Sequence, residues 1–272
     1  MVKIHVLSES APLLLLSLPL LSLLLLPPIT SAFTPFPPPY SYYSFKPTSN
    51  SQTMSFAATV ANTAARNVGK LTPSTSVLLI CDVQTRFRPL IHNMESLLHT
   101  TKFMTSVAKE LEIPMVATQQ YTKVFGPTIP EAFADPSDIG TLCPVFEKKK
   151  FSMLTDECSS HLQTLSATNE GGETPRTNYL LLGIEAHVCL QQTALDLLEL
   201  GHSVHVLADG VSSQQCYDRK MALKRMEQSG AWITTSQSAV FMLLGSAEHE
   251  KFKSVSALVK GRMGEVNEFN DE

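Results

Sequence analysis

Short, continuous apolar segments recur from residue 76 onwards, and helical patterns alternate with them. An apolar segment unbroken by polar residues is typical of a parallel strand that is covered on both faces. Strands that alternate with amphipathic helices build an open, right-handed, doubly wound sheet. We therefore predict an α/β fold with a mainly parallel sheet and helices on both of its faces. The predicted strands are 76–82, 114–118, 179–182, 203–209 and 231–234, and the predicted helices are 94–111, 156–165, 194–200, 218–229 and 238–244.

The first 73 residues are interpreted as a targeting presequence followed by a disordered linker. Residues 12–26 are almost all Leu, Ser and Pro, and this run of about 15 residues suits a signal-peptide core better than a membrane span of roughly 20. The tract from Phe33 to Cys81 has no acidic residue and is rich in Ser, Thr, Pro and Tyr, which is a transit-peptide composition. This order resembles the bipartite plastid presequences of algae and predicts a plastid protein with no membrane segment in its mature form. The alternatives are secretion, or a start at Met54 that leads to mitochondria or the cytosol.

The remainder of the chain is acidic, and its cysteines are not spaced as disulfide pairs. Residues 1–73 hold four basic residues and one acid, which leaves 17 basic and 24 acidic residues for 74–272. We divide this remainder into one domain, 74–262, and an acidic tail, 263–272. An acidic body argues against a nucleic-acid partner. An odd number of cysteines, five, predicts reduced thiols rather than a disulfide framework.

Cys189 stands where the predicted strand 179–182 turns into the following helix. A thiol on the first turn of a helix faces unpaired backbone N–H groups and the positive end of the helix dipole, and both favour the thiolate. We therefore interpret Cys189 as a candidate nucleophile. The alternative is a small, buried core cysteine.

Two further segments carry charged groups that a catalytic site can use. Asp82 ends the predicted strand 76–82, and ligands of open α/β sheets bind at the carboxyl ends of strands. Its alternative role is to cap the following loop. Residues 119–146 contain several Pro and Gly residues and little periodicity, which predicts a long functional loop. The three lysines 148–150 follow this loop, and such a run is ordinarily a solvated face.

The sequence predicts neither a cofactor nor a metal ion. No glycine-rich phosphate-binding motif follows any predicted strand, so a nucleotide is not expected. His202 and His205 are three residues apart on a strand, which directs them to opposite faces. His187 lies two residues before Cys189, too near in sequence to reach the thiol with good geometry.

Three motifs occur one after another along the chain: CDVQTRF at 81–87, FEKKKFSM at 146–153 and GIEAHVCLQQTA at 183–194. They resemble the isochorismatase-like cysteine hydrolases, and most closely the isochorismatase domain-containing proteins. The resemblance runs from about Leu71 to Val259. It implies a three-layer α/β sandwich, and it implies a homo-oligomer because relatives commonly form dimers or tetramers.

The resemblance also implies a catalytic triad. Such enzymes use an Asp, a Lys and a Cys, and the matching positions are Asp82, Lys148 and Cys189. Lys148 is the matching lysine because it stands three residues before the pair 151–152, Phe-Ser. Asp82 would take the thiol proton and return it to the leaving nitrogen, while the Lys148 ammonium would stabilise the thiolate and the carboxylate.

The surroundings of the thiol follow from the same resemblance. It implies a cis peptide bond between Ile184 and Glu185, and an oxyanion hole formed by the backbone N–H groups of Glu185 and Cys189. We also predict a substrate pocket, and the alternative role of its residues is packing or loop hydrogen bonding. The predicted pocket residues are Gln84, Phe87, Gln120 and Tyr121.

Two departures from related enzymes narrow the expected chemistry. True isochorismatases have glycine where Cys189 stands, because ether hydrolysis needs acid catalysis and no thiol. Nicotinamidases add an Asp/His metal cluster after the second strand, whereas residues 118–124 contain neither an acid nor a histidine. We therefore predict a metal-independent cysteine hydrolase that cleaves a C–N bond of a small amide or ureide. The alternatives are a catalytically idle binding or scaffold protein and a vinyl ether hydrolase of the isochorismatase type.

Overall fold

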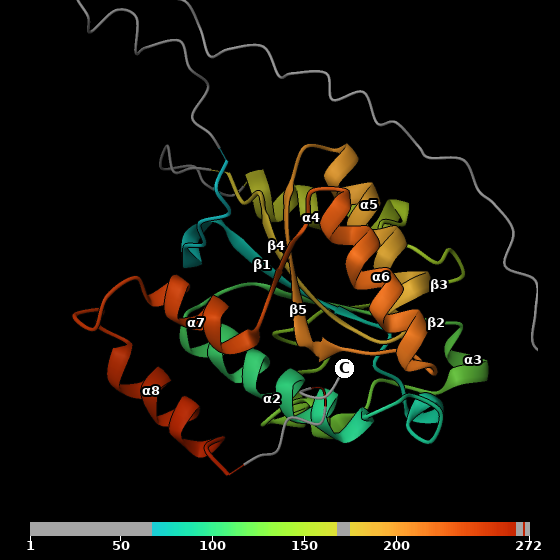
Figure 1. The fold of residues 1–272 in the computed structure, drawn as a ribbon, viewed down its shortest axis with the longest axis horizontal. Helices are drawn as coiled ribbons and strands as arrows, with labels where there is room; N and C mark the ends of the chain where they lie inside the picture. The colour runs from blue at the N-terminus through green and yellow to red at the C-terminus, as the bar shows by residue number, and fades with distance from the viewer. Residues whose placement is uncertain (1–66, 168–174, 265–268, 270–272) are drawn as a thin grey trace, which may run out of the picture. The chain divides into compact units, whose positions relative to one another are not determined.

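Six parallel strands form one sheet at the centre of the protein (Figure 1). The computed structural model describes residues 67–167, 175–264 and 269, so most of the presequence and linker, 1–73, and most of the acidic tail, 263–272, lie outside the described residues. The strand order is β3-β2-β1-β4-β5-β6, which confirms the predicted parallel, doubly wound α/β architecture. The strands are β1 (Ser76–Cys81), β2 (Met115–Gln120), β3 (Val145–Lys148), β4 (Asn178–Gly183), β5 (Ser203–Val211) and β6 (Trp232–Thr234).

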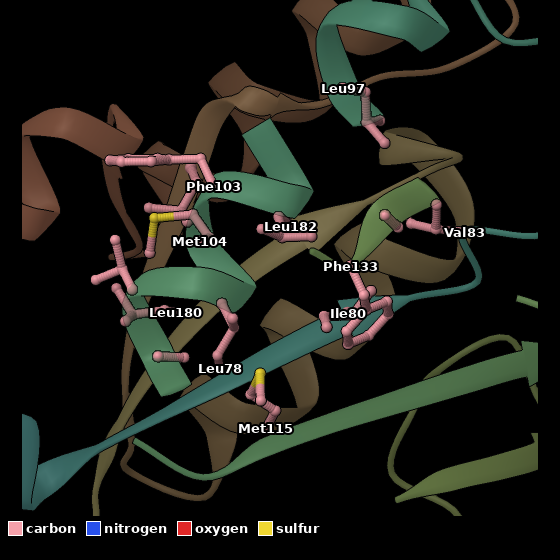
Figure 2. Close-up of a cluster of buried hydrophobic side chains, with 14 of the residues drawn as sticks. Leu78, Ile80, Val83, Leu97, Phe103, Met104, Met115, Phe133, Leu180 and Leu182 are labelled. Carbon is pink, nitrogen blue, oxygen red and sulfur yellow. The ribbon is translucent and has the colours of Figure 1, made fainter. Parts of the chain in front are cut away.

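Helices cover both faces of the sheet. Leu78 and Ile80 of β1 face α2 (Met94–Glu110), in the hydrophobic cluster part of which Figure 2 shows. On the same side, α7 (Ser236–Leu244) packs on β5 and α8 (Phe252–Gly261) packs on α2. Leu79, which alternates with Leu78 and Ile80 along the strand, packs towards α4 (Asp156–Ala167), α5 (Gln191–Glu199) and α6 (Cys216–Gln228). Both faces of β1 are therefore buried, as its unbroken apolar sequence predicts. No helix in the described part of the chain is both long enough and apolar enough to cross a membrane.

The register of the sheet aligns the carboxyl ends of its central strands. Cys81, the last residue of β1, pairs with Gly183 of β4 on one side and with Thr118 of β2 on the other. Gly183 has a φ of 138°, and a Cβ at this position would lie 2.2 Å from the Cys81 carbonyl oxygen. Only glycine fits here, and its small size lets the two strands end side by side. Residues that directly follow β1 and β4 therefore meet at one edge.

Three elements differ from the prediction. The expected loop 119–146 is largely irregular, but it includes the end of β2, a short helix α3 (Thr122–Phe125) and the start of β3. β3 is missing from the prediction because it has four residues, of which only Lys148 is buried, so it carries no apolar run. Helix α8 is also missing from the predicted set.

Candidate active site

Asp82 follows β1 at the carboxyl edge of the sheet, and hydrogen bonds fix both of its carboxylate oxygens. The residue is 1% exposed and has a left-handed backbone conformation, with a φ of 54°. Its Oδ1 accepts a hydrogen bond of 2.8 Å from Thr118 Oγ1 on the neighbouring strand. Its Oδ2 accepts one of 2.7 Å from Lys148 Nζ. The carboxylate therefore has one orientation, set by two other strands.

Lys148 ends β3, and its ammonium is the centre of a buried polar network. The side chain is fully buried, although it belongs to a run of three lysines. Besides Asp82, Nζ donates hydrogen bonds of 2.7 Å to Gln120 Oε1 and to the Phe151 carbonyl oxygen. Three good acceptors match the three N–H bonds of an ammonium group. Lys148 is therefore a paired internal charge and not part of a solvated face.

Gln84 and Gln120, two residues of the predicted pocket, support this ammonium through a chain of hydrogen bonds. Gln84 is fully buried; its Nε2 donates to the carbonyl oxygens of Gln120, at 3.0 Å, and Gly126, at 2.7 Å. Its Oε1 accepts from the Gln120 backbone N–H at 2.7 Å. Gln84 thus fixes the backbone of Gln120, whose side chain in turn holds Lys148.

The two aromatic residues of the predicted pocket lie in different surroundings. Phe87 is buried and stacks on Phe125, with 4.6 Å between the ring centroids. Tyr121 is 39% exposed, and the Lys149 ammonium lies 5.3 Å from the centre of its ring. Phe87 therefore contributes to internal packing, and Tyr121 reaches the surface.

Cys189 joins Asp82 and Lys148 in the same buried cluster. It lies on η5 (Ala186–Leu190), a π-helical turn that continues directly into α5, and it is 6% exposed. Its thiol interacts with both the Asp82 carboxylate and the Lys148 ammonium. The three residues of the predicted triad therefore converge, although they come from segments more than 40 residues apart.

Electrostatics keep the Cys189 thiol protonated at rest. Its pKa is raised to about 12, first by burial and then by the Asp82 carboxylate, while the Lys148 ammonium lowers it. The prediction that the helix start favours a thiolate is therefore wrong for the resting site, because burial and a neighbouring negative charge dominate. For Lys148, burial acts in the opposite direction and lowers the pKa of the ammonium, but Cys81, Asp82 and Cys189 raise it by more. The net pKa of Lys148 is therefore raised, which preserves the ammonium. A thiol of this kind needs a proton acceptor at the moment of attack, and Asp82 is the carboxylate that acts on it electrostatically.

The Ile184–Glu185 peptide bond is trans, so the predicted cis bond is wrong. No cis peptide bond occurs within the described ranges. The chain turns here through Glu185, which has a left-handed conformation with φ 50° and ψ 59°. In the described part of the chain the Glu185 N–H donates to no backbone oxygen, while Val188 and Leu190 donate to its carbonyl oxygen. The turn therefore leaves the Glu185 N–H available, as an oxyanion donor requires.

Two threonines of the site are absent from the predicted set. Thr118 orients Asp82, and Thr193 connects the turn of Cys189 to the segment after Lys148. Thr193 Oγ1 donates to the Cys189 carbonyl oxygen at 2.7 Å and accepts from Met153 N at 2.9 Å. Both threonines are at most 1% exposed. A hydroxyl in an otherwise apolar strand, or one turn after the nucleophile, is the signal that identifies such residues.

The described residues show no metal-ligand cluster, and the cavities found among them lie away from Cys189. No three His, Cys, Asp or Glu side chains of these residues lie together as metal ligands do. Three cavities, of about 340, 470 and 410 Å³, are lined by other residues and include none of Asp82, Lys148 and Cys189. All five cysteines are unpaired.

Comparison with known proteins gives matches over most of the folded body. The family model of the isochorismatase domain matches residues 76–238, a range that contains Asp82, Lys148 and Cys189. The secreted isochorismatase effector Isc1 of Phytophthora sojae is 43% identical over 209 residues, which cover 77% of this chain and 96% of that protein. Isochorismatase domain-containing protein 2 of Xenopus laevis is 41% identical over 194 residues, which cover 71% and 88% of the two chains. The structure of MAR1 ribonuclease from Caenorhabditis elegans superposes with a TM-score of 0.63 at 37% identity, covering 70% and 92%.

Proposed function

The chain belongs to the isochorismatase family of hydrolases, and on that premise we propose that it cleaves a C–N bond of a small amide or ureide through a thioester on Cys189. One observation carries the proposal: a single buried carboxylate, Asp82, is hydrogen-bonded to the Lys148 ammonium at 2.7 Å and, together with it, acts electrostatically on the Cys189 thiol. This arrangement supplies a nucleophile, its proton acceptor and a compensating positive charge. No cofactor takes part in the proposed reaction.

The first half of the reaction forms the thioester. Cys189 Sγ bonds to the carbonyl carbon of the substrate while the thiol proton passes to Asp82. The backbone N–H groups of Glu185 and Cys189 stabilise the oxyanion, and each such donor contributes about 3 kcal/mol to catalysis. Asp82 then returns the proton to the leaving nitrogen, the C–N bond breaks, and ammonia or an amine departs.

The second half hydrolyses the thioester. Asp82, again unprotonated, accepts a proton from a water molecule that attacks the carbonyl carbon. The tetrahedral species collapses, the C–S bond breaks, and the thiolate of Cys189 regains its proton. Lys148 stays charged throughout and offsets the negative charge that moves between Asp82 and Cys189.

A substrate screen with two matched variants tests this proposal. Purified full-length protein is incubated with small amides, ureides and carbamoyl compounds, and released ammonia is measured. We expect turnover that Cys189→Ala abolishes and Cys143→Ala retains, since Cys143 is also buried, with its pKa raised to about 12 by burial, but lies outside the cluster. An acyl adduct on Cys189, detected by mass spectrometry after rapid quenching, identifies the thioester. Turnover that persists in Cys189→Ala contradicts the mechanism.

The two alternative functions give different results in the same experiments. An idle binding or scaffold protein turns over none of the compounds and forms no adduct. A vinyl ether hydrolase, which the name of the Phytophthora sojae relative suggests, cleaves isochorismate, and this activity survives Cys189→Gly because the thiol is not needed.

We also propose a substrate size, an oligomeric state and a cellular location for the protein. The substrate is a small molecule, the protein is a homo-oligomer, and the presequence directs it to a plastid. Size-exclusion chromatography with light scattering measures the oligomeric state, and a mass equal to one chain contradicts the second statement.

A further inference from the structure

The aromatic ring of Phe269 is buried, although this residue lies in an acidic segment near the C-terminus. Only 8% of Phe269 is exposed. The Arg219 guanidinium lies over its ring, 4.1 Å from the ring centre, and the His92 ring lies edge-on to it, with 6.5 Å between the centroids. A guanidinium over an aromatic face is stabilising because the cation meets the negative side of the ring, and burial strengthens the attraction. Phe269 therefore packs on two side chains that come from distant parts of the chain.

Both of these residues hold the end of β5 and the residues that follow it. The Arg219 side chain is buried and donates hydrogen bonds to two backbone carbonyl oxygens of β5, at 2.7 and 2.6 Å. His92 acts through its backbone: its N–H donates to the Ser213 carbonyl oxygen at 2.9 Å, and its carbonyl oxygen accepts from Ser212 Oγ at 2.5 Å. The contacts of Phe269 therefore lie directly behind the segment that contains Ser212.

The Ser212 backbone in turn holds the oxyanion turn, residues 183–186. Its carbonyl oxygen accepts from the Ala186 N–H at 2.9 Å, and its N–H donates to the Gly183 carbonyl oxygen at 3.2 Å. Glu185, which provides an oxyanion donor in the proposed function, lies between these two points and has a left-handed conformation with φ 50°. A residue other than glycine keeps such a conformation only where neighbouring contacts fix it. The hydrogen bonds of Ser212 are contacts of this kind.

We propose that Phe269 is a positioning residue for the reaction, which holds the Ser212 backbone against the oxyanion turn through the two side chains on which it packs. This inference rests on the proposed function, because the turn affects turnover only if the Glu185 N–H stabilises an oxyanion. Without the ring, Arg219 and His92 lose a packing partner and the Ser212 backbone is held less firmly. The oxyanion donor is then misplaced, and a misplacement of about 1 Å can reduce the rate about 100-fold.

Kinetics of full-length variants test the proposal. Phe269→Ala removes the ring, and Phe269→Leu removes it while keeping a large apolar side chain that preserves the fold. We expect kcat, per folded enzyme, to fall about 10- to 100-fold in Phe269→Ala while KM changes less than about twofold, since an oxyanion donor acts on the transition state more than on the bound substrate. Phe269→Leu should lower kcat in the same direction. Wild-type kcat in both variants overturns the proposal.

Hydrogen exchange separates this local effect from a general loss of stability. Peptide-resolved exchange compares the amides of residues 184–190 with those of β1 in wild type and in each variant. In Phe269→Ala we expect the exchange of 184–190 to accelerate roughly 10- to 30-fold more than that of β1, the factor that corresponds to loss of a buried cation–π contact. Equal acceleration of both segments indicates global destabilisation and overturns the positioning role.

A neighbouring residue provides the matched control. Met263 precedes Phe269 by six positions and is 81% exposed, so Met263→Ala removes a side chain of similar length that is not buried. This variant should keep the wild-type kcat and the wild-type exchange of 184–190. Effects in Met263→Ala as large as those in Phe269→Ala contradict a specific role of the ring.

Exchange also distinguishes a failure of this inference from a failure of the hydrolase, because it needs no substrate. Selectively faster exchange of 184–190 in Phe269→Ala, in a protein whose wild type hydrolyses none of the compounds, supports the structural link and contradicts the hydrolase. Unchanged exchange of 184–190 overturns the link whatever the activity.

Discussion

Replacing Asp82 with asparagine should make Cys189 easier to ionise and, at the same time, abolish turnover. Asp82 is the second largest cause, after burial, of the raised pKa of Cys189, and Lys148 opposes it. Asparagine preserves the shape of the side chain, and its one carbonyl oxygen can still accept from Lys148 while its NH2 group donates to the Thr118 hydroxyl, but it has no negative charge. The ammonium then acts on the thiol without a neighbouring carboxylate, and the pKa of Cys189 falls from about 12.

The expected effect is large enough to measure. A charge within contact distance shifts a pKa by about 1 to 3 units, so loss of the carboxylate raises the thiolate fraction at pH 8 by roughly 10- to 1000-fold. The rate of alkylation follows the thiolate fraction. Hydrolysis fails in the same variant because the amide of the substituted side chain cannot accept the thiol proton.

Iodoacetamide labelling measures the effect site by site. Cys216 is the exposed cysteine, so a Cys216→Ser background removes the competing reaction, and peptide mass spectrometry follows Cys189 from pH 7 to 10. In the parent protein the rate should rise about tenfold per pH unit without a plateau, because the pKa of about 12 lies above this range. Lys148→Met is the opposite control: it removes the cation that lowers the pKa, so labelling slows.

Labelling of Asp82→Asn at the parental rate, or more slowly, refutes the reasoning that this carboxylate raises the pKa of the Cys189 thiol. Circular dichroism must accompany the measurement, because the variant leaves a buried ammonium without its carboxylate, which typically destabilises a protein by about 3–5 kcal/mol. Faster labelling of a folded variant that no longer hydrolyses amides separates the two proposed roles of Asp82, which are to keep the Cys189 thiol protonated at rest and to accept its proton during the reaction.

Other substitutions test the architecture around the site. Lys148→Met should lower the free energy of unfolding in urea by about 3–5 kcal/mol, because its carboxylate partner stays buried and unpaired; a loss below about 1 kcal/mol contradicts the described burial. Thr193→Val should lower it by about 1–3 kcal/mol, since two hydrogen bonds are lost without a change in shape. Gly183→Ala should prevent soluble expression, because the new Cβ would lie 2.2 Å from a carbonyl oxygen of β1. A fusion of residues 1–73 to a fluorescent protein should reach the plastid of an alga, and a fusion that begins at Met54 should not.

The sheet and the positions of Asp82 and Cys189 at its edge could be predicted because each has a local signal. Strands buried on both faces need unbroken apolar runs, and β1 and β4 have them. Asp82 and Cys189 directly follow such strands, so the parallel topology alone brings them to one edge. Lys148 is different: its surroundings in sequence indicate a solvated face, and only the motif resemblance identifies it.

The remaining features depend on contacts between distant segments. The pKa of Cys189 reflects burial and the Asp82 carboxylate, 107 positions away in the numbering, which a helix-dipole argument from neighbouring residues does not include. The buried position of Gln84 depends on backbone groups at Gln120 and Gly126 that only the folded chain brings together. Long-range desolvation and hydrogen bonding therefore decide these roles, and they have no periodic signature in the sequence.

The strand that carries Lys148 is a short strand at the edge of the sheet. β3 has four residues, lies at the edge of the sheet and pairs only with β2, and three of its residues keep contact with solvent. Amide hydrogens of β3 should therefore exchange through local opening, well before those of β1 and β4. Each opening would separate Lys148 from Asp82 and inactivate the proposed active site while the rest of the fold stays intact. The arrangement of Asp82, Lys148 and Cys189 therefore has a shorter lifetime than the folded protein.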